Sequence, residues 1–264
     1  MDLISSLPGP FSSWRLKYLR AEQHLRDYDS AAQWFEESHP WDVGTHFDDQ
    51  AGENVFIVSH VKPVPIEISL ILGDAFQAFR SALDHAVWDI VQIECFKPPD
   101  WAQFPIYTTR TAYKKNLWKL GGVRPDTLAL IEGLQPYDGM DDGGLRIEDK
   151  PLAILHRLNN SDKHRVVHLT AAMLIGSDVR IQGVATDISV PIGSGILSEG
   201  TEIARVAFGS LDSEMNVSFH FPTEIALSGE IFHARLVSPL ILDIKAAVLS
   251  ALTVLAPLTL TAPT

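Results

Sequence analysis

One uninterrupted apolar stripe constrains the fold of this chain more than any other feature. Within residues 66–95, apolar side chains recur every three or four positions, at Ile68, Leu72, Phe76, Phe79, Leu83, Val87 and Ile90. That spacing places them on one side of an α-helix. Pro65 directly precedes the run, and a proline suits the start of a helix. The pattern therefore predicts a long core helix over residues 66–95.

Periodicity also predicts the elements on either side of this helix. Residues 12–38 repeat the helical rhythm, and "THFDD" and "NVFIVSHV" flank the turn-like "QAGEN", which indicates a β-hairpin. Pro151 begins a second helical pattern that we extend to residue 175. Ser238 as N-cap and Pro239 behind it predict a closing helix. After Gly176 the period becomes two, which predicts antiparallel strands in "DVRIQGVA", "ISVPI", "GTEIARVAFG", "MNVSFHF" and "IFHARLV".

The order of these elements predicts the fold class and the domain organisation. Helices come first, strands follow and one helix ends the chain, which indicates an α+β fold and not a parallel βαβ sheet. We expect one domain over residues 1–264, with a helical part over about 1–176, a β-rich part over about 177–237 and a closing helix over about 238–256. Residues 96–150 are rich in Pro, Gly and Asp, with short helices expected around 110–120 and 124–133. So long an irregular segment is typical of the wall or lid of a site.

Composition narrows the classes of partner and the cellular location. The net charge of -12 argues against a broad grip on nucleic acid, although "YKKNLWK" and "DKHRVVH" could form a local basic cleft. The single cysteine, Cys95, excludes an intramolecular disulfide and is interpreted as a buried structural thiol. The first residues do not resemble a signal peptide, and "AAVLSALTVLAPLTLTA" fits a docking helix. We therefore expect a cytoplasmic protein that does not enter a membrane.

Three ionisable residues lie on the first long helix, in "RSALDH". Arg80 and Asp84 are one turn apart, at the edge of the apolar stripe, and could form an ion pair beside the core. His85 projects roughly 140° away from Arg80 on an ideal helix, so the two side chains do not stack on each other. Joint action of these residues requires a distorted helix, a long reach of the arginine or a partner element between them.

A second polar cluster, "NNSDKHR", falls in the second helical pattern. Asn159 and Asp162 project into its apolar line, where an unpaired polar group costs a few kcal/mol. We expect Arg80 or His85 to pair with Asp162. Alternatively, the cluster breaks the helix and makes Asn159 and Asp162 structural. The neighbouring cations, Lys163, His164 and Arg165, could face a phosphate or a partner's carboxylate, or form a solvated helix face.

These residue types are suited to cleavage of RNA without a metal ion. A histidine can carry protons near neutral pH, and an arginine or lysine can stabilise charge on a phosphate. The assignment gives His85 as general acid/base, Arg80 and Lys163 as phosphate binders, and Asp84 and Asp162 as orienting carboxylates. The candidate substrate-binding set is Asn159, Asp162, Lys163, His164, Arg165 and Tyr107, and Trp101 and Tyr137 are further candidates to stack on a base. No cofactor is expected. Asp84, His85, Asp162 and His164 are acceptable metal ligands, but their helical phases do not converge.

The two polar motifs carry a resemblance to known proteins. "GDAFQAFRSALDHAVWDI" together with "LHRLNNSDKHR" resembles a family of bacterial and phage-associated proteins of unknown function, and the resemblance implies a shared fold. This chain departs from the family pattern at Ala78, where an asparagine is expected, and at Arg157, which replaces an acidic residue. The Arg-x4-His helix is more distantly similar to HEPN ribonucleases, which commonly act as dimers in toxin and defence systems. That similarity implies RNA or a nucleotide as substrate and a homodimer.

A second function remains open beside the ribonuclease. The chain could be a non-enzymatic binding module with a protein partner, in which the Arg, Asp and His residues form a structural network. That interpretation requires Arg80 and Asp162 to be buried and paired. The enzymatic interpretation requires His85 or His164 to border a cleft that solvent can reach.

Overall fold

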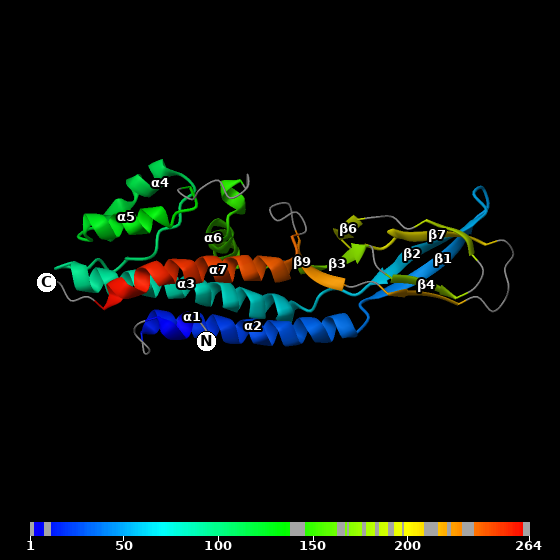
Figure 1. Ribbon diagram of the computed structural model, residues 1–264, viewed down its shortest axis with the longest axis horizontal. Helices are drawn as coiled ribbons and strands as arrows, with labels where there is room; N and C mark the ends of the chain where they lie inside the picture. Colours follow the sequence, from blue (N-terminus) through cyan, green and yellow to red (C-terminus); the bar gives the residue numbers. More distant parts are fainter. Residues whose placement is uncertain are drawn as a thin grey trace. The chain divides into compact units, whose positions relative to one another are not determined.

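The computed structural model describes residues 3–7, 12–137, 146–162, 167, 169–175, 178–182, 185–189, 193–196, 198–208, 216–220, 223–228 and 235–260. Its helices and antiparallel strands confirm the α+β class (Figure 1). The helices are α1 (Leu3–Ser6), α2 (Ser13–Glu37), α3 (Ile66–Glu94), α4 (Arg110–Lys115), η1 (Leu117–Leu120), α5 (Pro125–Gly133), η2 (Ile147–Asp149), α6 (Pro151–Asp162), α7 (Val237–Leu255) and η3 (Ala256–Thr259). The strands are β1 (Trp41–Asp48), β2 (Glu53–Val61), β3 (Leu169–Ile175), β4 (Asp178–Gln182), β5 (Ala185–Ser189), β6 (Gly193–Ile196), β7 (Glu202–Phe208), β8 (Asn216–His220) and β9 (Thr223–Leu227).

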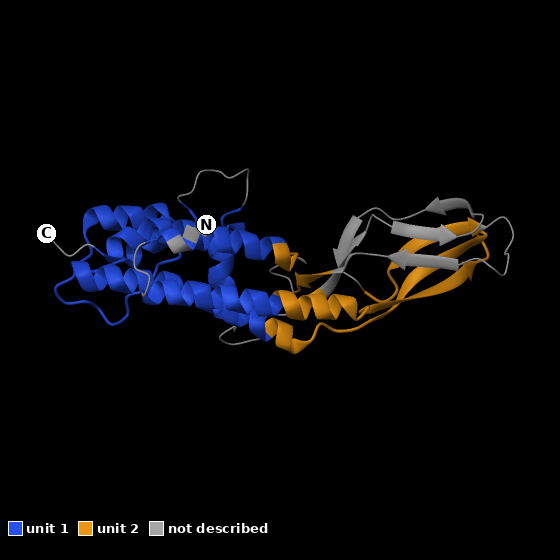
Figure 2. Cartoon of the chain, turned by 60° about the horizontal axis from the view of Figure 1, so that its bottom comes forward, with its two compact units in different colours: residues 1–28, 70–167, 239–264 blue, residues 29–69, 168–238 orange. Residues whose placement is uncertain are grey.

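The chain divides into two compact units, and neither is a continuous stretch of sequence (Figure 2). Unit 1 comprises residues 1–28, 70–167 and 239–264, and unit 2 comprises residues 29–69 and 168–238. The division falls inside α2, α3 and α7 and does not follow the boundary expected near residue 176. That the whole chain folds as one domain stays a prediction.

Unit 1 is a helical body in which parts of α2, α3 and α7 lie side by side (Figure 1). The apolar stripe of α3 is completely buried from Leu72 to Ile90, which confirms the predicted core helix. Tyr18 of α2 meets Phe79 of α3 edge to face, with 5.4 Å between ring centroids. Lys245 of α7 forms an ion pair with Glu22 of α2, at 2.6 Å.

Unit 2 contains the strands, and the described pairings are antiparallel. β1 and β2 form the predicted hairpin, with Asp48 opposite Glu53. The larger sheet has the order β1-β2-β7-β5, and two smaller sheets have the orders β6-β3-β9 and β4-β8. Val55 and Val58 of β2 and Ile203 and Val206 of β7 are buried, so these central strands supply the core of the larger sheet.

The second long helix is shorter than the sequence predicted. We expected it to run from Pro151 to about residue 175, but α6 ends at Asp162 and Leu169–Ile175 forms the strand β3. A short apolar run such as "LTAAMLI" is compatible with a buried strand as well as with a helix. Pairing with β9 on one side and β6 on the other decides for the strand. The alternative in which "NNSDKHR" interrupts the helix agrees with this end point.

The chain also differs from expectation around the last helix. The strand predicted in "IFHARLV" is limited in the described residues to a single bridge between Leu236 and Ala226, and α7 begins at once with Val237. Ser238 therefore lies inside the first turn and is not the N-cap. The span Val237–Thr259 is long and apolar enough to cross a membrane, with a mean hydropathy of 1.8 and 44% of its most apolar window buried. The core helix of a globular unit can have the same properties.

Candidate functional site

Arg80 and Asp84 of α3 together hold the backbone of Phe104. Nη2 of Arg80 lies 2.8 Å from Oδ1 of Asp84 and donates a hydrogen bond to the carbonyl oxygen of Phe104. The same Oδ1 atom accepts a hydrogen bond from the backbone N–H of Phe104, at 2.9 Å. Phe104 is itself completely buried. The pair therefore satisfies both backbone groups of a residue that belongs to no helix or strand.

Gln135 holds the next residues of the same segment. Its Oε1 atom accepts from the backbone N–H of Tyr107 at 3.1 Å, and its Nε2 atom donates to the carbonyl oxygens of Pro105 and Ile131 at 2.9 and 3.1 Å. Gln135 is 2% exposed. Sequence reasoning missed this residue, because a single glutamine in "GLQPY" carries no pattern that indicates its role.

The end of α3 fixes the segment at a further point. The buried carboxylate of Glu94 accepts from the backbone N–H of Arg124 at 2.9 Å and from Oγ1 of Thr127 at 2.7 Å. Arg124 also forms an ion pair with it, at 3.1 Å. The Cys95 thiol lies 3.5 Å from the carbonyl oxygen of Gly121, and Cys95 is buried as predicted. The segment that the sequence predicted as irregular is thus held by buried polar side chains.

Electrostatics favour a structural role for Arg80. The residue is 6% exposed, and burial lowers the pKa of its guanidinium, an effect that the charge of Asp84 opposes. An arginine remains protonated under any physiological condition, so this charge stays inside the protein and needs its partners. The Nη1 atom of Arg80 is buried without a hydrogen-bond partner. Arg80 is therefore already engaged, through Nη2, and is shielded from an external phosphate.

His85 does not join Arg80. It is half-buried on the side of α3 that also carries the exposed residues Asp74, Gln77 and Trp88. The charge of His85 lowers the pKa of Asp89, while burial, the larger effect, raises it. The two residues of the predicted Arg-x4-His motif thus point to different sides of one helix, as the helical projection predicted.

Most of the second motif lies outside the described residues. Lys163, His164 and Arg165 fall there, as does the side chain of Asp162, so the expected pairing of Asp162 with Arg80 or His85 stays a prediction. Asn159 is buried in α6, with 4% of its surface exposed. The neighbouring Asn160 hydrogen-bonds to Nε2 of His156 at 3.0 Å. In the described part of the chain, no cluster of three His, Cys, Asp or Glu side chains could hold a metal ion.

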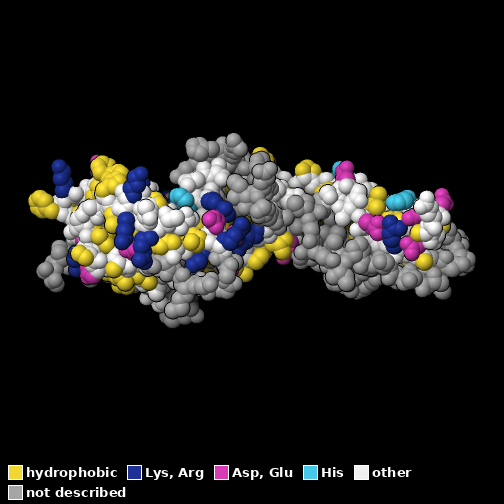
Figure 3. All heavy atoms as spheres, turned by 90° about the horizontal axis from the view of Figure 1, so that it is seen from above, with side chains coloured by type: hydrophobic (Ala, Val, Ile, Leu, Met, Phe, Trp, Pro, Cys, Tyr) yellow, Lys and Arg dark blue, Asp and Glu magenta, His cyan; other side chains and the backbone are white. Residues whose placement is uncertain are grey.

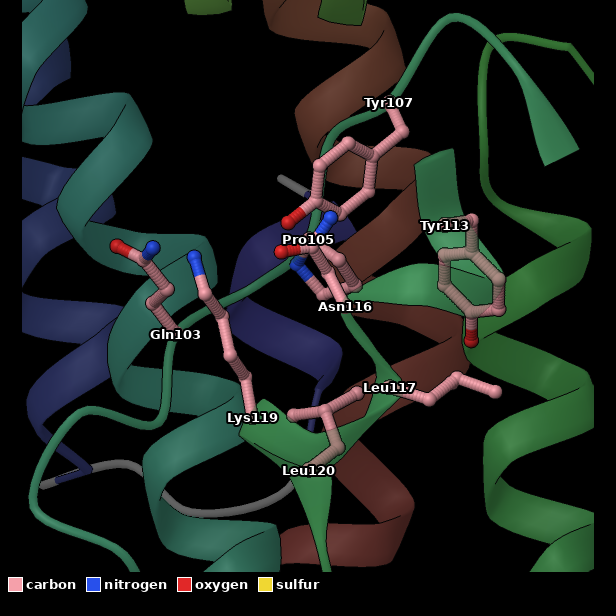
Figure 4. A pocket seen from close by; sticks show the side chains of 8 residues that line it. All are labelled: Gln103, Pro105, Tyr107, Tyr113, Asn116, Leu117, Lys119 and Leu120. Atoms are coloured by element: carbon pink, nitrogen blue, oxygen red, sulfur yellow. The ribbon is translucent and has the colours of Figure 1, made fainter. Parts of the chain in front are cut away.

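A shallow hollow lies beside the segment held by Arg80 and Gln135 (Figure 4). It is open to solvent and has room for about one water molecule, and it is lined by Gln103, Pro105, Tyr107, Tyr113, Asn116, Leu117, Lys119 and Leu120. Among the residues of the predicted site that the structure describes, Tyr107 alone lines it. Its ring meets Tyr113 edge to face at 6.4 Å, and Tyr113 in turn lies 6.2 Å from Tyr137. His85 is not part of this lining.

Two exposed tryptophans are close in sequence to residues that line the hollow. Trp101 and Trp118 are 55% and 59% exposed, and their ring centroids are 5.7 Å apart. The amine of Lys119, which lines the hollow, is 5.9 Å from the centroid of the Trp118 ring. The sequence had indicated Trp101 as a stacking residue and "YKKNLWK" as a basic concentration, but it did not indicate that the two come together.

Comparisons with known proteins add no relative. No family model, no curated protein and no solved structure matches this chain.

Proposed function

We propose that the chain is a non-enzymatic binding module, in which Arg80 and Asp84 form a structural network. One observation carries the proposal: the guanidinium of Arg80 is buried and binds Asp84 and the backbone of Phe104. A phosphate-binding arginine must present N–H groups to its ligand. Here the side chain instead shapes residues 96–137, which carry the hollow and the exposed tryptophans. The pair therefore supports a binding surface without taking part in chemistry.

The test measures thermal stability and RNA cleavage together in the presence of EDTA. We expect the wild type to cut no RNA, and Arg80→Ala to melt at a much lower temperature. His85→Ala should melt like the wild type, because His85 stands on the outer side of α3. His24→Ala, a half-buried histidine of α2, is the matched control. EDTA-resistant cleavage that His85→Ala abolishes, with unchanged melting and an active His24→Ala control, would overturn the proposal.

A metal-independent ribonuclease is the second candidate, and the position of His85 favours it. His85 is accessible from solvent and lies close enough to Asp89 for its charge to oppose the rise that burial causes in the pKa of that carboxyl. An adjacent carboxylate can orient a catalytic imidazole. Since Arg80 is engaged elsewhere, a second copy of the chain would have to supply the phosphate-binding cation, which requires a homodimer. Cleavage that rises with the square of protein concentration at low concentration is the result this candidate requires.

The expected cellular context is part of the same proposal. A cytoplasmic location and a role in conflict between phage and host rest on the sequence, as does the absence of membrane insertion. Fractionation of cells that express the full chain tests the location, and α7 makes the membrane fraction the informative one.

A further inference from the structure

We propose that unit 1 binds single-stranded nucleic acid across the surface formed by Trp101, Trp118, Lys119 and the adjoining hollow, here called the indole–lysine surface. Bases would stack on the two indoles, and Lys119 with neighbouring lysines would bind the phosphates. The inference rests on the proposed binding function and names its ligand. It concerns a different surface from Arg80 and His85.

The first argument is the exposure of the two indoles. A tryptophan buries a large apolar area when it can, so two neighbouring rings that are each more than half exposed require an explanation. Trp101 and Trp118 are tilted against each other at an interplanar angle of 59°, and each keeps more than half of its surface exposed to solvent. Stacking of a base on an indole is favourable and tolerates any base, because every base has a π-face.

The second argument is charge. Residues 97–124 carry Lys97, Arg110, Lys114, Lys115, Lys119 and Arg124 but only one carboxylate, Asp100, although the whole chain has a net charge of -12. Arg110 and Arg124 form ion pairs with Glu132 and Glu94. The four lysines have no acidic partner within ion-pair distance in the described part of the chain. Figure 3 shows Lys and Arg side chains interspersed with hydrophobic ones over unit 1. Such a surface favours an anionic ligand with flat apolar groups.

The third argument is the polar side chains at the rim of the hollow, which can form hydrogen bonds with the edge of a base that lies outside it. Gln103 and Lys119 extend along the same side of it (Figure 4). The amide of Gln103 has no hydrogen-bond partner in the described residues, whereas that of Asn116 donates to the carbonyl oxygen of Ala112 and keeps its oxygen available. An acidic peptide would also satisfy the lysines, but its carboxylate side chains carry no aromatic ring, whereas every nucleotide of a single strand carries a base that can stack on an indole. The combination therefore favours nucleic acid.

The geometry of the indole–lysine surface depends on the side chains of Arg80, Asp84 and Gln135, which hydrogen-bond to the backbone of residues 104–107. Trp101 lies three residues before Phe104, where the segment held by Arg80, Asp84 and Gln135 begins. Trp118 belongs to η1, between α4 and Gly121. A rigid backbone lowers the conformational entropy lost on binding. The hydrogen bonds of these side chains thus restrict the backbone that carries Trp101, Trp118 and Lys119.

The test is fluorescence anisotropy with labelled oligouridylate and oligodeoxythymidylate of about 20 nucleotides, which separates RNA from DNA as the source of the ligand. We expect wild type to bind at least one oligonucleotide, with affinity falling at least about tenfold between 50 and 200 mM salt. Trp101→Ala combined with Trp118→Ala should weaken binding at least about tenfold. The corresponding Phe double variant should retain most of the affinity, because a phenyl ring also stacks. Lys119→Glu should weaken binding as well.

Control variants and competing polyanions test whether binding is specific to the indole–lysine surface and to single-stranded nucleic acid. Trp34→Ala removes an indole that is 65% exposed in unit 2, and Lys17→Glu reverses an exposed charge on α2, so both should bind like wild type. The proposal is overturned if neither oligonucleotide binds at tens of micromolar, if the double Ala variant binds unchanged, or if duplex DNA or polyglutamate binds more tightly. Absence of binding and of cleavage leaves the non-enzymatic proposal standing. Cleavage that depends on His85 would instead overturn that proposal and leave this surface as the place where substrate binds.

Discussion

Asp84 and Arg80 lie 2.8 Å apart on α3, and together they bind both the N–H and the C=O of Phe104. Two side chains one helical turn apart thereby form the hydrogen bonds that a strand partner would otherwise provide. The arrangement explains why an ion pair is kept at the edge of an apolar stripe, since the backbone that it satisfies is buried and belongs to no helix or strand.

Asp84→Ala should lower the free energy of unfolding by about 2–4 kcal/mol, because the buried guanidinium of Arg80 and the N–H of Phe104 both lose a partner. Urea denaturation measures the loss. Glu199→Ala breaks the exposed pair between Glu199 and His60 and should cost less than about 1 kcal/mol. Arg80→Met combined with Asp84→Leu removes the unpaired charge but should recover only part of the stability, since Phe104 remains unsatisfied. Full recovery would show that the backbone contacts contribute little.

Gln135→Glu should be strongly destabilising at neutral pH although the two side chains have the same shape. The new carboxylate would face the carbonyl oxygens of Pro105 and Ile131, where Gln135 now donates. We expect a loss of about 2–4 kcal/mol at pH 8 and a smaller loss at pH 4, where a protonated carboxyl can donate again. Gln77→Glu on the exposed side of α3 controls for the added charge. Equal losses in the two variants would exclude the proposed role of Gln135.

Gly122→Ala should cost more stability than Gly52→Ala. Both glycines have positive φ, 97° and 70°, but a Cβ atom at Gly122 would meet the Sγ atom of Cys95 at 2.9 Å, whereas the space around Gly52 is open. We expect about 1 kcal/mol for Gly52→Ala and roughly 1–3 kcal/mol more for Gly122→Ala. Adding Cys95→Ala to the Gly122 variant should restore part of the difference, as measured by urea denaturation. If Cys95→Ala restores no stability, the whole loss in the free energy of unfolding comes from backbone strain at residue 122.

Glu36→Gln should stabilise the protein at neutral pH. Burial, and then the charge of Glu224, raise the pKa of Glu36 above its ordinary value of 4.5, and Oε2 of Glu224 is buried without a hydrogen-bond partner. The folded state therefore binds the proton more tightly than the unfolded state. This contribution to stability is fully present below pH 4.5 and is lost as pH rises through the folded-state pKa.

The melting temperature of Glu36→Gln should thus exceed that of the wild type at pH 7, and the difference should shrink towards pH 4. Glu37→Gln, an exposed neighbour that hydrogen-bonds only to Gln33 in the described structure, should show no such trend. A melting temperature of Glu36→Gln at or below that of the wild type at pH 7 would contradict the assignment.

Local sequence patterns determined the elements whose burial is periodic. The seven-residue stripe of α3, the hairpin of β1 and β2 and the helix start at Pro151 follow from the spacing of apolar residues and from turn chemistry, and the structure confirms them. The roughly 140° between Arg80 and His85 is likewise a property of one helix and needs no tertiary information.

Tertiary structure alone decided how these elements pair and which distant residues their side chains contact. Leu169–Ile175 is a strand because β6 and β9 pair with it, and a short apolar run carries no information about such neighbours. Arg80 has a structural role because the fold brings the backbone of Phe104 next to its guanidinium. Trp101 contacts Trp118 because the chain between them folds back. These contacts join residues far apart in sequence, where periodicity has no signal, so only the packed structure fixes which polar group satisfies which.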